Sequence, residues 1–180
     1  MITLLEVALI FTILFCATSY SHPLESNPQA KVATSLNTIK NFSRISTTLA
    51  SSGMPTNSEL ILVKESGYQH IISLIPGNFS EEQQQISALG MSFAQIAVDW
   101  HQPTLADFKQ FVQLMDGYQN DKVLVHCRLN YRASAFAYLY QTTQLNVDEI
   151  TAKQQMNSIW QPEGVWLDYI NMIEHHYQSQ

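Results

Sequence analysis

The chain has 180 residues, of which 46% are hydrophobic and 13% charged. This composition excludes a largely disordered chain and fits one compact domain with a full core. There are 15 acidic and 9 basic residues, so the net charge is −6, and the sequence contains no cluster of Lys and Arg. A nucleic-acid-binding surface is therefore excluded, because the phosphate backbone requires clustered cations.

The first strongly patterned segment is an apolar run over residues 4–17, which is followed by the small residues Ser19 and Ser21. The length of the run suits the core of a secretion signal and falls short of the ~20 apolar residues that a membrane-spanning helix needs. We therefore expect a signal peptide over residues 1–21 and an exported, periplasmic mature chain. The alternative is an uncleaved membrane anchor.

Residues 22–40 are rich in Ser, Asn, Gln, Pro and Thr and lack sustained periodicity, which indicates a flexible lead-in. The domain is expected over residues 41–180. Removal of the signal peptide would also remove Cys16, and Cys127 would be the only thiol left. An internal disulfide is then excluded, and a single cysteine in an oxidising compartment is either buried and inert or reactive.

After the lead-in, short apolar runs alternate with helical patterns. This alternation is typical of an α/β domain with a central, mostly parallel sheet of four to five strands flanked by helices. The last central strand is a continuous apolar run, as expected for a strand that is buried on both faces. The predicted strands cover residues 45–50, 70–75, 92–98 and 122–126.

Several helix starts are visible as capping patterns. Two of them are capping boxes, in which a Thr and an acidic residue three positions later bond each other's backbone N–H groups. These boxes are Thr56 with Glu59, and Thr104 with Asp107. Ser80, Asn130 and Asn146 mark the starts of three further helices, and a last helix carries an apolar stripe. The members of that stripe are Trp166, Tyr169, Ile170, Ile173 and Tyr177.

The segment VLVHCRLNYRAS, residues 123–134, contains the residues with chemical potential. A buried strand ends at Cys127, a short loop follows, and Arg132 stands at the start of a helix. Open α/β sheets bind ligands at the carboxyl ends of their strands, and loop N–H groups together with the helix dipole favour an anion there. The same field stabilises a thiolate, and Arg132 supplies a planar fork for two anionic oxygens.

The succession of His126, Cys127, Arg132 and Ser134 after an apolar strand resembles the signature of the cysteine-dependent protein tyrosine and dual-specificity phosphatases. The order of elements agrees over most of the mature chain. The turn over residues 52–56, SGMPT, resembles the bacterial dual-specificity-like branch that includes the phosphatase-like domain of beta-lactamase-hydrolase-like proteins. The resemblance implies a protein tyrosine phosphatase-like fold and hydrolysis of a phosphate monoester.

One feature departs from most of these phosphatases. The four residues 128–131 separate Cys127 from Arg132, one fewer than is usual, and Asn130 stands at or near the place of the loop glycine. Asn tolerates left-handed backbone angles better than most residues, so Asn130 is expected to replace that glycine. The shorter loop also resembles that of rhodanese-type sulfurtransferases, which hold a sulfur atom on the cysteine. His126 favours the phosphatase interpretation.

The resemblance implies a two-step phosphoryl transfer in which the Cys127 thiolate attacks phosphorus in line. Arg132 and the loop amides hold the equatorial oxygens. Asp99 lies 28 residues before Cys127, on the loop after the third strand, and is the expected general acid and later base. His101 is the alternative acid, whereas the capping box accounts for Asp107. The predicted phosphate-binding loop consists of Arg128, Leu129, Asn130 and Tyr131.

Three neighbouring residues have supporting interpretations. His126 is expected to shape the loop through hydrogen bonds. Ser134 either donates a hydrogen bond to the thiolate or is a simple helix-face serine, and Trp100 packs beside the substrate or in the core. No set of His, Cys or carboxylate residues has metal-ligand spacing, and no Gly-rich phosphate-binding run occurs, so no metal or other cofactor is expected.

Three alternatives to a phosphatase stay open from the sequence. They are a rhodanese-like sulfurtransferase carrying a persulfide on Cys127, a phosphate-binding pseudophosphatase, and a structural domain without a site. For the phosphatase, the expected substrates are a phosphorylated small molecule, a lipid head group or a phosphoprotein. Contact with a membrane is expected only if the N-terminal segment stays attached.

Overall fold

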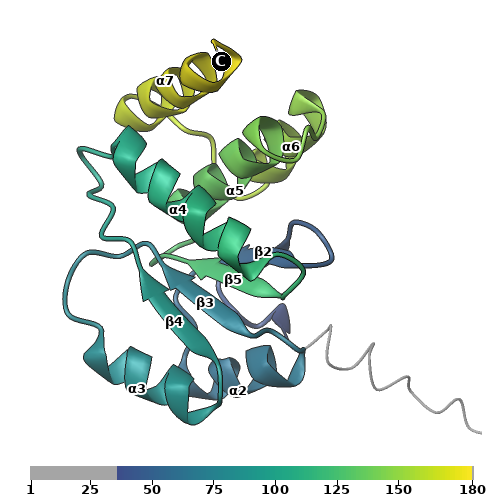
Figure 1. Ribbon diagram of the computed structural model, residues 1–180, viewed down its shortest axis with the longest axis vertical. Helices are drawn as coiled ribbons and strands as arrows, with labels where there is room; N and C mark the ends of the chain where they lie inside the picture. Colours follow the sequence, from purple (N-terminus) through teal and green to yellow (C-terminus); the bar gives the residue numbers. More distant parts are fainter. Residues whose placement is uncertain (1–35, 180) are drawn as a thin grey trace, which may run out of the picture.

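The computed structural model describes residues 36–179, so the predicted signal peptide lies outside the described residues. The described chain forms a five-stranded sheet in the order β1-β2-β5-β3-β4 (Figure 1). β1 and β2 pair antiparallel, and the other neighbours pair parallel. The predicted fold class is therefore confirmed. The strands are β1 (Ser43–Arg44), β2 (Leu49–Ser52), β3 (His70–Ser73), β4 (Ser92–Gln95) and β5 (Val123–His126).

Helices cover both faces of this sheet (Figure 1). α2 (Asn57–Glu65) and α3 (Ser80–Ala88) pack on one face. α4 (Leu105–Tyr118) and α5 (Tyr131–Thr143) pack on the other, and α6 (Glu149–Asn157) and α7 (Val165–Gln178) pack against α5. The result is a three-layer domain with a hydrophobic cluster on each side of the sheet.

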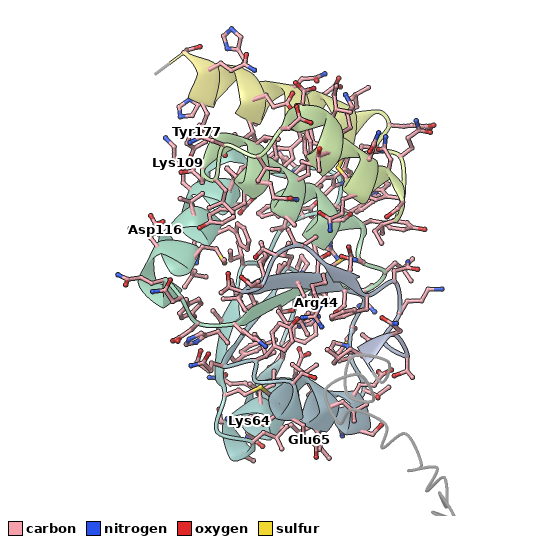
Figure 2. The ribbon with its side chains drawn as sticks, turned by 90° about the vertical axis from the view of Figure 1, so that its right-hand side faces the viewer. Arg44, Lys64, Glu65, Lys109, Asp116 and Tyr177 are labelled. Carbon is pink, nitrogen blue, oxygen red and sulfur yellow. The ribbon has the colours of Figure 1, made fainter. Side chains whose placement is uncertain are left out.

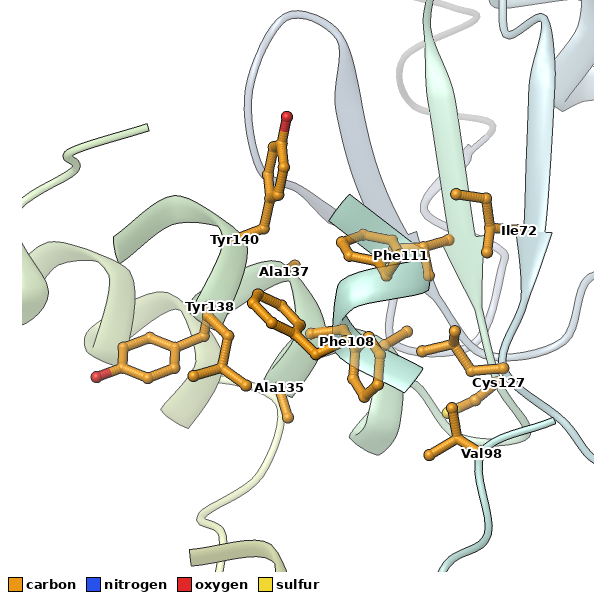
Figure 3. Packing of buried hydrophobic residues seen from close by; sticks show 14 of the residues in the cluster. Ile72, Val98, Phe108, Phe111, Cys127, Ala135, Ala137, Tyr138 and Tyr140 are labelled. Carbon is orange, nitrogen blue, oxygen red and sulfur yellow. The ribbon is translucent and has the colours of Figure 1, made fainter. Parts of the chain in front are cut away.

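The central strand β5 contributes side chains to both hydrophobic clusters. Val123 and Val125 belong to the cluster with α4 and α5, whereas Leu124 belongs to the cluster with α2 and α3. All four residues of β5 are buried, as its continuous apolar sequence predicts. The larger cluster extends to the carboxyl end of β5, where Cys127 lies beside Val98 (Figure 3). Cys127, the predicted nucleophile, is therefore packed in the hydrophobic core.

The first predicted strand is wrong in position. The chain pairs as β2 from Leu49, and residues 45–48 form the turn of a hairpin with β1. The Ser46 hydroxyl accepts hydrogen bonds from the backbone N–H groups of Thr48 and Leu49, at 3.2 and 3.0 Å. These side-chain bonds favour a turn over an extended strand. The other predicted strands are confirmed in place but are shorter, and the third ends at Gln95.

Both predicted capping boxes are confirmed, at Thr56 and at Thr104. Of the three further helix starts, Asn130 is confirmed as the N-cap of α5, and the other two differ from prediction. Phe79 is the N-cap of α3, and the Ser80 N–H donates to the Asn78 side chain. Asp148 is the N-cap of α6, because its carboxylate accepts from the N–H of Thr151 at 2.9 Å. Short polar side chains compete as caps, and local sequence alone did not select between them.

The outside of the domain is polar, and charged side chains such as Glu65, Lys109 and Asp116 lie on the outer faces of the helices (Figure 2). The described part starts inside the predicted lead-in, and there Leu36 and Ile39 are 0% and 1% exposed and pack with α2. Leu36 and Ile39 are therefore part of the hydrophobic core. Within residues 36–179, no helix has the length and hydropathy for a membrane span.

Candidate active site

Cys127 follows the carboxyl end of β5 and lines a cavity of about 350 Å³. Arg132, five positions later, lines the same cavity from the first turn of α5. Both residues are nearly buried, at 2% and 7% exposure. The structure therefore places the predicted sulfur nucleophile and the predicted anion-binding cation on one side of the loop. The lining residues are Trp100, Cys127, Arg128, Leu129, Tyr131 and Arg132.

Asn130 gives the loop its shape. Its backbone is left-handed, with φ 73°, as the sequence predicts for the residue that replaces a glycine. The Asn130 amide donates to the Asn41 carbonyl at 2.6 Å, and the Asn41 amide donates to the Leu129 carbonyl at 2.9 Å. This reciprocal pair fastens the loop to the segment before β1.

The other side of the loop lies against the turn that follows β2. Gly53 forms an isolated bridge with Leu129, and the Cys127 N–H donates to the Ser52 carbonyl at 3.2 Å. A side chain at Gly53 has no room, because a Cβ would lie 2.8 Å from the Cβ of Lys40. The SGMPT turn therefore supports the cysteine loop directly.

The N-terminus of α5 faces the same region as the cysteine. The N-cap Asn130 makes no side-chain cap hydrogen bond, and the first intrahelical bond runs from the Ser134 N–H to the Asn130 carbonyl at 2.8 Å. The N–H groups of Tyr131, Arg132 and Ala133 precede that bond and have no intrahelical acceptor. Such N–H groups, with the helix dipole, favour an anion.

Arg132 is held by one of its nitrogens and leaves another unpaired. Its Nη1 donates to the Val98 carbonyl at 2.7 Å. Its Nε is buried and has no hydrogen-bond partner within residues 36–179. Buried polar groups of native proteins are nearly always paired, so this nitrogen suits a ligand oxygen. The bond to Val98 also connects Arg132 to the segment that contains Asp99.

Asp99 is exposed and lies on the loop between β4 and α4. Its Oδ1 accepts hydrogen bonds from the backbone N–H groups of His101 and Gln102, at 2.7 and 3.1 Å. Asp99 is not among the residues that line the cavity, whereas its neighbour Trp100 is. The loop therefore reaches the cavity through Trp100, whereas Asp99 and His101 are exposed and do not line it.

Aromatic side chains form one wall of the cavity. Trp100 packs against Trp166 and Trp160, with ring centroids 5.3 and 5.7 Å apart. Tyr131 stacks on Trp160 at 4.9 Å. The indole N–H of Trp166 donates to the Trp100 carbonyl at 3.0 Å, which fixes the loop between β4 and α4. Sequence reasoning noted Trp100 and missed the roles of Trp160 and Trp166.

His126 is fully buried beneath the loop, and its Nε2 lies 3.2 Å from Oε1 of Glu82 in α3. This distance is short enough for a polar contact, although the angles between the two groups do not form a regular hydrogen bond. Burial, and next the guanidinium of Arg132, lower the pKa of His126 to about 3. Burial raises the pKa of Glu82 to about 7. The sequence analysis did not single out Glu82.

Two further residues take roles that the sequence already allowed, Ser134 as a helix-face serine and Asp107 as a member of the capping box. The Ser134 hydroxyl donates to the Tyr131 carbonyl at 3.0 Å and accepts from the indole of Trp160 at 3.1 Å. The single hydroxyl proton of Ser134 is therefore donated within the first turn of α5 and not to the thiolate. This hydrogen bond agrees with the interpretation of Ser134 as a helix-face serine. Asp107 accepts from Thr104 in the capping box. Within the described chain, no group of three His, Cys, Asp or Glu side chains is arranged to hold a metal ion.

Comparisons with solved structures identify the family. A crystal structure described as "Putative phosphatase (DUF442)" from Shewanella putrefaciens CN-32 is 32% identical, with a TM-score of 0.72, over 80% of this chain and 97% of that one. The chain belongs to the DUF442 family. It thereby falls within the cysteine-based tyrosine and dual-specificity phosphatase superfamily, and a phosphatase function is supported.

More distant structures share the fold alone. The catalytic domain of the Saccharomyces cerevisiae PP-IP phosphatase SIW14 is 16% identical, with a TM-score of 0.65, over 78% of this chain and 93% of that one. TpbA of P. aeruginosa is 18% identical, with a TM-score of 0.58, over 78% and 85%. No protein-family model and no curated protein matches the sequence.

Proposed function

We propose that this DUF442 chain hydrolyses a phosphate monoester through a phosphocysteine intermediate on Cys127. The observation that carries the proposal is that Cys127 and Arg132 line one cavity, where Arg132 presents a buried Nε without a protein partner. A dianionic phosphate supplies the oxygens that this nitrogen and the first N–H groups of α5 require.

In the first step, the Cys127 sulfur attacks phosphorus, and the bond from phosphorus to the ester oxygen breaks. Arg132 and the N–H groups of the loop hold the equatorial oxygens, whose charge is spread in the transition state. Asp99 gives its proton to the leaving oxygen, which departs as an alcohol. The hydrogen bond from Arg132 to the Val98 carbonyl supports this role, because Asp99 directly follows Val98 in the chain.

In the second step, water attacks the phosphocysteine. Asp99, now ionised, takes a proton from that water, and the bond between sulfur and phosphorus breaks to release phosphate and the thiolate. His126 keeps its predicted supporting role beneath the loop. These steps use only groups of the protein and water.

The cavity also bears on the leaving group. Trp100, Leu129 and Tyr131 give it an apolar wall, and among residues 36–179 Arg128 and Arg132 are the cationic residues that line it. One phosphate on an alcohol with an apolar face fits this lining better than a polyphosphate, because several phosphates require more cations. A phosphorylated small molecule, a lipid head group or a phosphoprotein side chain meets this condition.

A sulfurtransferase is the second candidate, because four residues separate Cys127 from Arg132. The experiment is to assay the chain on para-nitrophenyl phosphate and on thiosulfate, with Cys127→Ser and Arg132→Ala alongside. We expect cleavage of the ester that Cys127→Ser abolishes. Turnover of thiosulfate without ester cleavage supports the sulfurtransferase, and tight binding of vanadate without turnover of either substrate supports a pseudophosphatase.

A further inference from the structure

A carboxyl group is buried behind the cysteine loop. Glu82 lies in the first turn of α3, and its side chain is 7% exposed, whereas the preceding Glu81 is exposed. A buried carboxylate loses several kcal/mol of hydration, so a protein retains one only where a partner or a function stabilises it. The partner here is His126, whose Nε2 lies 3.2 Å from Oε1 of Glu82.

His126 is the last residue of β5 and precedes the nucleophile. Its backbone is held on both sides, since it pairs with Ser52 of β2 and Ser73 of β3. Its carbonyl accepts from the Leu74 N–H at 2.9 Å. The His126 ring also interacts with the backbone of Cys127. A displacement of the ring is therefore transmitted to the residue that carries the sulfur.

The pair is uncharged between about pH 3 and about pH 7. Burial holds the pKa of Glu82 at about 7 and, together with Arg132, that of His126 at about 3. A protonated Glu82 can donate to the ring nitrogen, whereas an ionised Glu82 accepts from it, and the ring must then change tautomer. Ionisation of Glu82 therefore changes the contact of the residue that directly precedes Cys127.

The surroundings of the pair contain few other charges. Arg132 of α5 is the cation that acts on His126. On its other side Glu82 borders a cavity of about 540 Å³. Within residues 36–179, Glu81 is the only other charged residue that lines it, and α2 contributes the uncharged Asn57 and Leu60. Both carboxyl oxygens of Glu82 are themselves buried.

We propose that Glu82 is a positioning residue for Cys127: its contact with His126 holds the end of β5 in the arrangement that directs the sulfur into the active-site cavity. The inference rests on the proposed phosphatase function. Glu82 is not a catalytic residue, because it is not among the residues that line the cavity of Cys127 and Arg132.

The test uses three variants of the full chain. Glu82→Ala removes the contact, Glu82→Gln keeps a hydrogen-bonding group of the same shape that does not titrate, and Glu81→Gln is the matched control on the same helix turn. We expect Glu82→Ala to lower kcat on para-nitrophenyl phosphate by about 10-fold to 100-fold with little change in KM, as for a misplaced reacting group. Glu82→Gln should restore most of the rate, and Glu81→Gln should match the wild type.

A second readout separates positioning from simple loss of packing. The rate at which iodoacetamide alkylates Cys127 is followed against pH by mass spectrometry of the peptide that contains it. We expect Glu82→Gln and the wild type to react equally below about pH 6 and to differ several-fold at about pH 8, where the ionised Glu82 of the wild type makes a different contact with His126. Glu81→Gln should follow the wild type throughout.

Alkylation does not require ester cleavage, so the two proposals can fail separately. If the wild type cleaves no ester but the alkylation difference is present, the phosphatase function is wrong and the role of Glu82 stands. The inference is overturned if the wild type cleaves the ester and two results hold together. These results are that Glu82→Ala has the kcat of the wild type, and that Glu82→Gln has the alkylation rates of the wild type at every pH. If Glu82→Ala does not fold, the alkylation rates of Glu82→Gln decide alone.

Discussion

Replacement of Asn130 by Ala and by Gly tests the shape of the cysteine loop. Both variants lose the hydrogen bond from the Asn130 amide to the Asn41 carbonyl, which is 2.6 Å long and contributes about 1 kcal/mol. Ala must in addition adopt the φ of 73°, which costs it about 1–2 kcal/mol. Gly adopts that angle freely but increases the entropy of the unfolded chain, which costs about 0.5–1 kcal/mol.

The sums are about 2–3 kcal/mol of destabilisation for Asn130→Ala and about 1.5–2 kcal/mol for Asn130→Gly. Urea denaturation measures both. The variants should differ more in activity, because Ala shifts the loop N–H groups whereas Gly leaves them in place. We expect kcat on para-nitrophenyl phosphate to fall by about 100-fold for Ala and by less than about 10-fold for Gly.

Asn146 supplies the control. It is exposed, also has a positive φ of 52°, and lies on the loop before α6, outside the active-site cavity. Its Ala and Gly variants should show the same order of stability with no change in kcat. The reasoning is refuted if Asn130→Ala is as stable and as active as Asn130→Gly, since the left-handed backbone would then not matter.

Four further outcomes are expected. Asp99→Asn should lower kcat on para-nitrophenyl phosphate by about 100-fold or more in steady-state assays, because an amide cannot give a proton to the leaving oxygen. Arg132→Lys should lower kcat/KM by about 100-fold in steady-state assays, because an ammonium cannot hold the Val98 carbonyl and two phosphate oxygens together. Phe111→Ala should lower the free energy of unfolding, measured in urea, by about 3–5 kcal/mol, since Phe111 is 0% exposed. The pKa of Glu82 is about 7 in the folded chain and 4.5 ordinarily, so the free energy of unfolding of the wild type falls as pH rises between these values. In urea titrations, the free energy of unfolding of Glu82→Gln should therefore equal that of the wild type near pH 4 and exceed it by about 3 kcal/mol at pH 8.

The parts of the fold that sequence reasoning predicted correctly depend on local patterns. The capping boxes at Thr56 and Thr104 satisfy N–H groups within one turn of the helix, so their spacing is visible in the sequence. The burial of β5 follows from its unbroken apolar run. The left-handed angle of Asn130 follows from the tolerance of Asn for that region.

The parts that were missed depend on contacts between distant segments. α3 has a Glu- and Gln-rich sequence that is typical of an exposed helix, yet Glu82 is buried because β5 brings His126 beneath it. The aromatic wall was missed for the same reason, since Trp160 and Trp166 meet Trp100 only through the packing around α5. Periodicity within one segment contains no information on contacts between distant segments.

The hydrogen bond from Arg132 to the Val98 carbonyl has a thermodynamic consequence. A free arginine loses up to about 2 kcal/mol of rotamer entropy when a ligand immobilises it. Arg132 has already lost most of that freedom in the folded chain, since the side chain is 7% exposed and its Nη1 is bonded. The anion site is therefore preorganised. The entropy of orienting the guanidinium is lost when the chain folds and not when the substrate binds.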